Sequence, residues 1–127
     1  MWLWSNIFIK NLSGNEHLII DGSPRTVDEA EHLGVALKFF QRGIPTVVFM
    51  KVSREWSTTR MKERAAKENR ADDSEESIKR RLSWYEREVL PTIERYRRDR
   101  DYRFLEVNGE QTVETVHQEI LNKVFVV

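Results

Sequence analysis

Residues 18–26 have the sequence Leu18-Ile19-Ile20-Asp21-Gly22-Ser23-Pro24-Arg25-Thr26, in which an apolar run leads into a turn and a helix start. The run from His17 to Ile20 is short and rich in β-branched residues, which predicts a buried strand. Ligands of open α/β sheets bind beyond the carboxyl ends of strands, so Asp21, Gly22 and Arg25 form a first candidate site. The alternative is an ordinary strand-to-helix turn that needs Asp, Gly and Pro only for its geometry.

Strand and helix patterns alternate on both sides of this stretch. Thr26 and Glu29 form a capping box, which predicts a helix to about residue 40 with an apolar stripe of Ala30, Leu33, Leu37 and Phe40. Residues 69–73 are a polar break with Asp73 as the next N-cap, and Pro91 is expected to kink or restart the helix that follows. Strands are expected at 46–52 and 104–107, and further helices at 2–12, at 55–67, and from the cap at Asp73 to Arg98. A last helix is expected to carry the apolar stripe Val113, Val116, Ile120 and Val124. This order predicts an α/β fold with a parallel sheet and helices packed on its faces.

Composition limits the class of protein. The chain has 127 residues, which fits a single domain spanning 1–127, and it contains no cysteine. No apolar run approaches the ~20 residues of a membrane span, so we expect a cytoplasmic protein that does not enter membranes. Its net charge is zero, which argues against a nucleic-acid partner, although residues 51–103 hold 16 basic and 12 acidic side chains.

Part of that basic excess is a second candidate site. Four arginines flank the polar break: Arg60, Arg64, Arg70 and Arg81. The first two are four residues apart and share a helix face. Guanidinium groups on two helices that bracket a loop could close around a polyphosphate. The alternative is a set of surface ion pairs, such as Arg60 with Glu63 or Arg64 with Glu68.

Together these motifs resemble those of adenylate kinases and related nucleoside monophosphate kinases. The resemblance rests on residues 18–26, on Arg60-x-x-x-Arg64, on residues 70–82 and on Val107-Asn108-Gly109, and Tyr85 and Pro91 match the helices in between. It covers nearly all of residues 15–125 in family order. It implies a three-layer, P-loop-kinase-like parallel sheet with helices on both faces, and a short lid at about 61–73. The implied reaction is ATP + AMP to 2 ADP with Mg²⁺.

The same resemblance assigns residues to the acceptor site. Gly22, Ser23, Pro24 and Arg25 would line the AMP site, with Arg25 on the phosphate. Glu29 stands where a base-reading glutamine is common, and it is also the third residue of the capping box. Ser23 stands where an aromatic residue is usual, which changes the packing near the acceptor.

The resemblance also assigns residues to the donor and to catalysis. Arg60 would stack on the adenine of ATP, Arg64 would hold the donor phosphates, and the backbone near Gln111 would meet the donor base. Arg70 and Arg81 would hold the phosphates being transferred, and both would also contact AMP. Asp21 would support Mg²⁺ through water. Catalysis would therefore rest on Arg64, Arg70 and Arg81.

One family element has no counterpart in the sequence. None of the five glycines belongs to a G-x-x-x-x-G-K-[ST] loop, whose N–H groups and lysine cradle phosphates. We therefore expect the C-terminal two thirds of the family domain, with an incomplete sheet that lacks the central P-loop strand. This chain alone is expected to transfer phosphate negligibly, and the exposed sheet edges could drive self-association. The alternative is a non-catalytic remnant that binds nucleotide or a protein.

Overall fold

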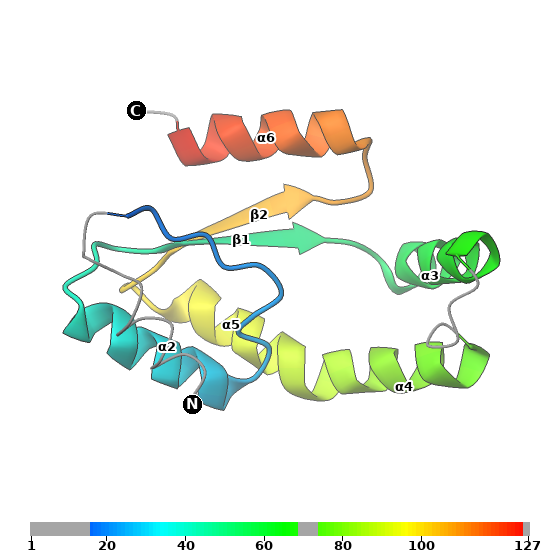
Figure 1. The fold of residues 1–127 in the computed structure, drawn as a ribbon, viewed down its shortest axis with the longest axis horizontal. Helices are drawn as coiled ribbons and strands as arrows, with labels where there is room; N and C mark the ends of the chain where they lie inside the picture. The colour runs from blue at the N-terminus through cyan, green and yellow to red at the C-terminus, as the bar shows by residue number, and fades with distance from the viewer. Residues whose placement is uncertain (1–15, 69–73, 126–127) are drawn as a thin grey trace.

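The computed structural model describes residues 16–68 and 74–125, and it alternates helices with two strands (Figure 1). The helix expected at 2–12 lies outside these residues. In chain order the elements are α2 (Val27–Phe39), β1 (Thr46–Lys51), α3 (Arg54–Glu68), α4 (Glu75–Trp84), the π-helical turn η2 (Tyr85–Val89), α5 (Leu90–Arg98), β2 (Arg103–Asn108) and α6 (Val113–Phe125). The expected strands at 46–52 and 104–107 are therefore confirmed to within one residue.

The first of these helices, α2, begins at the expected cap. The Oγ1 of Thr26 accepts a hydrogen bond from the backbone N–H of Glu29 over 3.3 Å, which satisfies one of the free N–H groups at the helix start. The stripe predicted to face the core is buried at Ala30, Leu33 and Leu37. These side chains recur at helical spacing and pack inward, so burial of apolar surface holds α2 in place.

The two strands form a parallel sheet whose carboxyl ends lie together. β1 and β2 pair in register from Thr46 opposite Arg103 to Lys51 opposite Asn108. Val107 on β2 is only 1 % exposed. Figure 1 draws α6 on one side of the sheet and α2 and α5 on the other. The architecture is thus a mixed helix and strand fold with a small parallel sheet, compatible with an α/β kinase fold.

The expectation of a strand at residues 17–20 is wrong for this structure. The segment makes no strand pairing among the described residues. Leu18 and Ile20 pack against the core beneath α2, whereas Ile19 is 93 % exposed. A β-strand needs a neighbouring strand to take its N–H and C=O groups, and an apolar pattern cannot supply one.

The helices after β1 differ from expectation in small ways. The N-cap of α4 is Ser74, whose side chain accepts from the N–H of Ser77, and not Asp73. Pro91 lies just after the π-helical turn, and the backbone keeps helical angles at Tyr85, Val89 and Leu90, so the helix continues through Pro91 and does not restart there. Val113, expected on the packed stripe of α6, is 78 % exposed because it opens the helix. No helix within 16–68 and 74–125 is long and apolar enough to cross a membrane.

Candidate functional site

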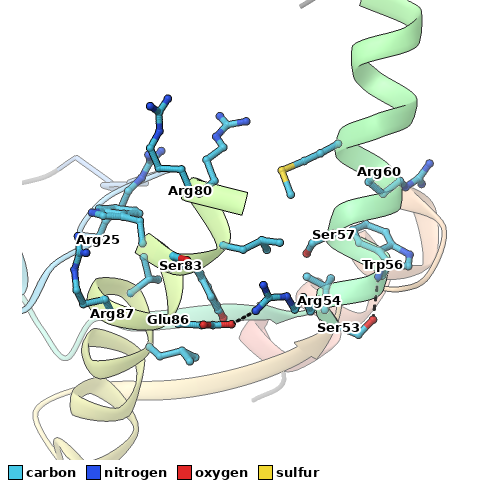
Figure 2. A pocket seen from close by; sticks show the side chains of 18 of the residues that line it. Arg25, Ser53, Arg54, Trp56, Ser57, Arg60, Arg80, Ser83, Glu86 and Arg87 are labelled. Atoms are coloured by element: carbon cyan, nitrogen blue, oxygen red, sulfur yellow. Dashed lines mark hydrogen bonds and ion pairs between the residues drawn. The ribbon is translucent and has the colours of Figure 1, made fainter. Parts of the chain in front are cut away.

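A large cavity lies next to the carboxyl end of β1. It has a volume of about 1130 Å³ and is walled by the first turns of α3 on one side and by α4 and η2 on the other (Figure 2). Arg25, at the end of the turn before α2, also reaches it. The cavity therefore occupies the edge of the sheet where ligands of open α/β folds bind.

Four of the predicted arginines line this cavity. Arg25, Arg60, Arg64 and Arg81 all line it, although they come from three separate segments of the chain. Arg70 lies outside the described residues. Guanidinium groups from opposite walls of one cavity can bind several phosphoryl oxygens at once, which single surface ion pairs cannot do.

Three lining arginines were not among the predicted site residues: Arg54, Arg80 and Arg87. Among the described residues, the only carboxylate in the lining is that of Glu86, which accepts a hydrogen bond from Arg54 and so joins α3 to η2 (Figure 2). Within the part of the lining that the structure describes, seven arginines against one glutamate make the cavity strongly cationic in a chain whose net charge is zero. The basic excess of residues 51–103 is the sequence signal that pointed toward these residues.

Arg60 is held in place by two neighbours on α3. Its guanidinium carbon lies 5.1 Å from the ring centroid of Trp56, within cation–π range. Its NH1 also contacts the Oε2 of Glu63 at 3.3 Å, so the surface ion pair that sequence reasoning offered as the alternative does form. The ion pair is exposed and contributes little stability. It leaves Arg60 in the cavity wall, so the pairing and a ligand-binding role are compatible.

The turn before α2 is fixed by its own hydrogen bonds. Gly22 has a φ of +72°, a backbone conformation that residues with a Cβ rarely adopt. The Nε of Arg25 donates to the carbonyl oxygen of Gly22 over 2.6 Å. The backbone N–H of Arg25 donates to the Oε2 of Glu29 over 2.7 Å. These bonds set the direction in which Arg25 enters the cavity.

Several predicted site residues do not line the cavity: Asp21, Gly22, Ser23, Pro24, Glu29 and Gln111. The first five lie within four residues of Arg25 in the chain, in the turn or at the start of α2. Gln111 follows β2, and its amide Nε2 donates to the carbonyl of Asn108 at 3.0 Å and to the Oε2 of Glu119 at 2.8 Å.

Protonation states near the sheet edge follow from burial and hydrogen bonding. Burial raises the pKa of Tyr85, which lines the cavity, so its phenol is neutral at physiological pH. As a neutral phenol, Tyr85 can donate a hydrogen bond to an anion in the cavity. Beside the carboxyl end of β1, the backbone N–H of Ser53 donates to the carboxylate of Glu110 and lowers the pKa of that carboxyl group.

The residues that could hold a divalent cation are few. Within 16–68 and 74–125, no three His, Asp or Glu side chains gather as a metal site. Asp21 is an exposed single carboxylate at the end of the segment before the turn. Mg²⁺ is commonly held by one or two carboxylates together with substrate phosphates and water, and a lone Asp fits that mode but no dedicated protein cage.

Known proteins match most of the chain. An adenylate kinase from Leptospira biflexa is 38 % identical over 106 residues, which is 84 % of this chain and 56 % of that protein. An adenylate kinase from Bacteroides fragilis is 36 % identical over 107 residues, with the same coverage of 84 % and 56 %. A UMP-CMP kinase from Lentinula edodes is 32 % identical over 108 residues, covering 83 % of this chain and 44 % of that enzyme.

The chain spans about half the length of the curated relatives that it matches. No family model matches the sequence. The relatives nonetheless agree in being named as nucleotide kinases, and each match covers more than four fifths of this chain. Over the matched 84 % of its length, this chain therefore belongs to the adenylate kinase family of nucleoside monophosphate kinases.

Proposed function

We propose that this chain supplies the arginine side of a nucleoside monophosphate kinase site that interconverts ATP + AMP and 2 ADP. The observation that carries the proposal is the meeting of Arg25, Arg60, Arg64 and Arg81 around one cavity at the carboxyl end of β1. Phosphoryl transfer gains most of its rate from positioning and from cations aimed at the charge that develops on the phosphoryl oxygens. A cavity with this lining is suited to that task.

The proposed roles divide the cavity into an acceptor side at Arg25 and a donor side at Arg60 and Arg64. Arg25 binds the acceptor phosphate, with Gly22, Ser23 and Pro24 shaping the turn that holds it. On the donor side, Arg60 stacks on the base and Arg64 binds the donor phosphates. Arg81 binds the phosphates in transfer together with Arg70, which belongs to the short lid proposed at about 61–73.

Mg²⁺ would accompany ATP as the cation that neutralises charge on the donor phosphates. Asp21 is the described residue that would hold its water shell, since its carboxylate follows the segment that leads into the acceptor turn. The chain's own part in this step is to orient the phosphates with arginines.

We further propose that this chain alone transfers phosphate negligibly. The sequence contains no G-x-x-x-x-G-K-[ST] loop, and no lysine lines the cavity among residues 16–68 and 74–125. Among the described residues, segment 17–20 pairs with no strand, and β1 pairs with β2 alone. Both observations support an incomplete sheet. A strand that carries such a loop would complete it, and open edges of this kind also favour self-association. The alternative is a nucleotide-binding protein without catalysis.

Two measurements on the purified full chain test the proposal. We expect saturable binding of ATP in calorimetry, and no ADP above background when the chain is incubated with ATP, AMP and Mg²⁺. Robust ADP formation would refute the requirement for the loop. Absence of any ATP binding would refute the kinase-type site itself.

A further inference from the structure

The outward face of α2 carries apolar side chains that the described residues leave uncovered. Val35 is 69 % exposed and Phe39 is 77 % exposed, and helical spacing places both opposite the buried stripe of Leu33 and Leu37. Ile44, which follows the end of α2, is also exposed. Single exposed apolar residues are common on protein surfaces, whereas large neighbours one helical turn apart indicate a surface that another element covers.

The described part of the chain begins next to this face. The first described residue, Glu16, lies beside the C-terminal end of α2, where its carbonyl oxygen accepts a hydrogen bond from the Nη1 of Arg42 over 2.7 Å. The Oε2 of Glu16 also lies 3.6 Å from the Nη2 of the same arginine. Residues 1–15 are therefore tethered to the end of α2 that carries Phe39.

Arg42 has further donors at this point. Its side chain is only 15 % exposed, and its Nε and Nη2 are buried with no hydrogen-bond partner among the residues that the structure describes. A buried donor without an acceptor is costly. The last four carbonyl groups of a helix have no partner within that helix, and a cation is favourable at a helix C-terminus. A helix that ends just before Glu16 would supply the acceptors that Arg42 lacks.

Residues 2–12 have a sequence that fits this place. Trp4, Phe8 and Leu12 are four residues apart, so the helix expected over 2–12 places them in one apolar stripe. Lys10 is the only charged residue in the segment. Such a stripe needs an apolar partner surface, and the nearest one along the chain is the outward face of α2.

The length of the connection sets how the two helices meet. Residues 13–15 span at most about 10 Å, which matches the roughly 8–10 Å between the axes of packed helices. Both helices then run toward Arg42, so they lie side by side in the same direction. Because each residue of a helix rises about 1.5 Å, this arrangement sets Leu12 near Phe39 and Phe8 near Val35.

We propose that residues 2–12 form a helix that packs on the outward face of α2, against Val35 and Phe39, and that Arg42 caps its C-terminal carbonyl groups. The occupant of this face is thus a segment of the same chain. The docked helix removes apolar surface from water and fixes the start of the segment that leads to the turn of Arg25. A second copy of the chain is the competing occupant, and the test below separates the two.

Disulfide cross-linking of the full chain tests the docking, because the sequence contains no cysteine that could interfere. Phe8→Cys/Val35→Cys places one thiol on each side of the interface. Asn6→Cys/Val35→Cys has a nearly equal tether, but its first thiol lies on the opposite face of the helix. We expect the Phe8 pair to form an intramolecular disulfide at least about tenfold faster than the Asn6 pair under mild oxidation, since a disulfide needs Cβ atoms about 3.5–4.5 Å apart.

Mass spectrometry of the proteolysed products identifies each bond. Equal rates for the two pairs would indicate an undocked tether and overturn the inference, as would the absence of a disulfide in both. Covalent dimers in place of the intramolecular bond would assign the face to a second copy and also overturn it.

Two further substitutions in the Phe8→Cys/Val35→Cys chain test the contacts. Phe39→Ser removes an exposed side chain, so α2 keeps its buried stripe, and it should slow disulfide formation about threefold or more because apolar contact is lost. Arg42→Gln should slow it by a similar factor, whereas Arg98→Gln, at an exposed arginine of α5, should change the rate by less than about twofold. An unchanged rate in Phe39→Ser would overturn the docking, and equal effects of Arg42→Gln and Arg98→Gln would overturn the cap.

Discussion

The backbone N–H of Arg25 donates to the Oε2 of Glu29 over 2.7 Å, while the Nε of the same arginine donates to the carbonyl of Gly22 over 2.6 Å. Glu29, in the first turn of α2, thus holds the turn from which Arg25 enters the cavity. The family resemblance places Glu29 where a base-reading residue is common, whereas in this structure its carboxylate holds the turn that carries Arg25.

This relationship predicts different outcomes for two substitutions of Glu29. Glu29→Ala removes the acceptor and should lower the free energy of unfolding by about 1 kcal/mol, comparable to the loss of a helix cap. It should also weaken tripolyphosphate binding, because Arg25 is no longer held. Glu29→Gln keeps an oxygen acceptor and should retain most of both properties. Urea denaturation and calorimetry measure the two effects, and identical behaviour of the Ala and Gln variants would contradict this role.

Gly109 and Gly43 form a matched pair for testing the end of the sheet. A Cβ on Gly109 would lie 2.7 Å from the Cγ1 of Val52 and 3.3 Å from the carbonyl oxygen of Lys51, whereas one on Gly43 would meet nothing within 4 Å. Gly109→Ala should therefore destabilise the fold by about 1–3 kcal/mol through overpacking. Gly43→Ala should be neutral or slightly stabilising. Chemical denaturation that ranks the two variants in the opposite order would contradict the close packing of the β2 turn on β1.

Tyr96 carries a buried hydroxyl that has no hydrogen-bond partner within the described part of the chain. The ring is 4 % exposed and packs edge-to-face on Tyr102 with centroids 4.7 Å apart. Tyr96→Phe should raise the free energy of unfolding by about 1 kcal/mol, because an unsatisfied polar group is removed. Tyr96→Leu should lower it by about 2 kcal/mol or more, because the ring is lost. Thermal and urea unfolding test both, and a clear destabilisation by Tyr96→Phe would mean that the hydroxyl is bonded.

The decrease of the unfolding free energy at acidic pH should depend on Glu106. Hydrogen bonds from Arg97 and Lys51 lower the pKa of this carboxyl group below its ordinary value of 4.5. Its ionised form therefore stabilises the folded state above that value, and the contribution is lost as the pH falls through the lower folded-state pKa. Glu106→Gln should make the unfolding free energy less dependent on pH below about 4.5, and Arg97→Gln should raise the pKa of Glu106 seen by NMR titration. If the unfolding free energy of Glu106→Gln falls as steeply at acidic pH as that of the unchanged chain, Glu106 is not the cause of this pH dependence.

The elements that sequence predicted correctly are those with local causes. The Thr26 cap and the buried stripe of α2 depend on residues three or four apart, so they can be recognised within one window of sequence. Ser74 as the cap of α4 was missed because Asp73 beside it has an equally suitable side chain.

Long-range features were harder to predict. Residues 17–20 have a strand-like pattern, but a strand depends on a neighbour that no local window contains. The cavity was predicted only in part, because Arg80 and Arg87 gain their place from how α4 and η2 lie against α3. Charge counts pointed to the right segment of the chain, and only the fold shows which of its arginines share a wall.

The most direct test of the arginine cavity is an NMR titration of the full chain, labelled with ¹⁵N at arginine, with ATP. The Nε–Hε signals of Arg25, Arg60, Arg64 and Arg81 should shift together and saturate at one equivalent of ATP. The signal of Arg103, which donates to the carbonyls of Lys123 and Val124 at the end of α6, should stay in place. Saturating shifts confined to arginines outside the cavity, or no shift of these four signals, would contradict the account.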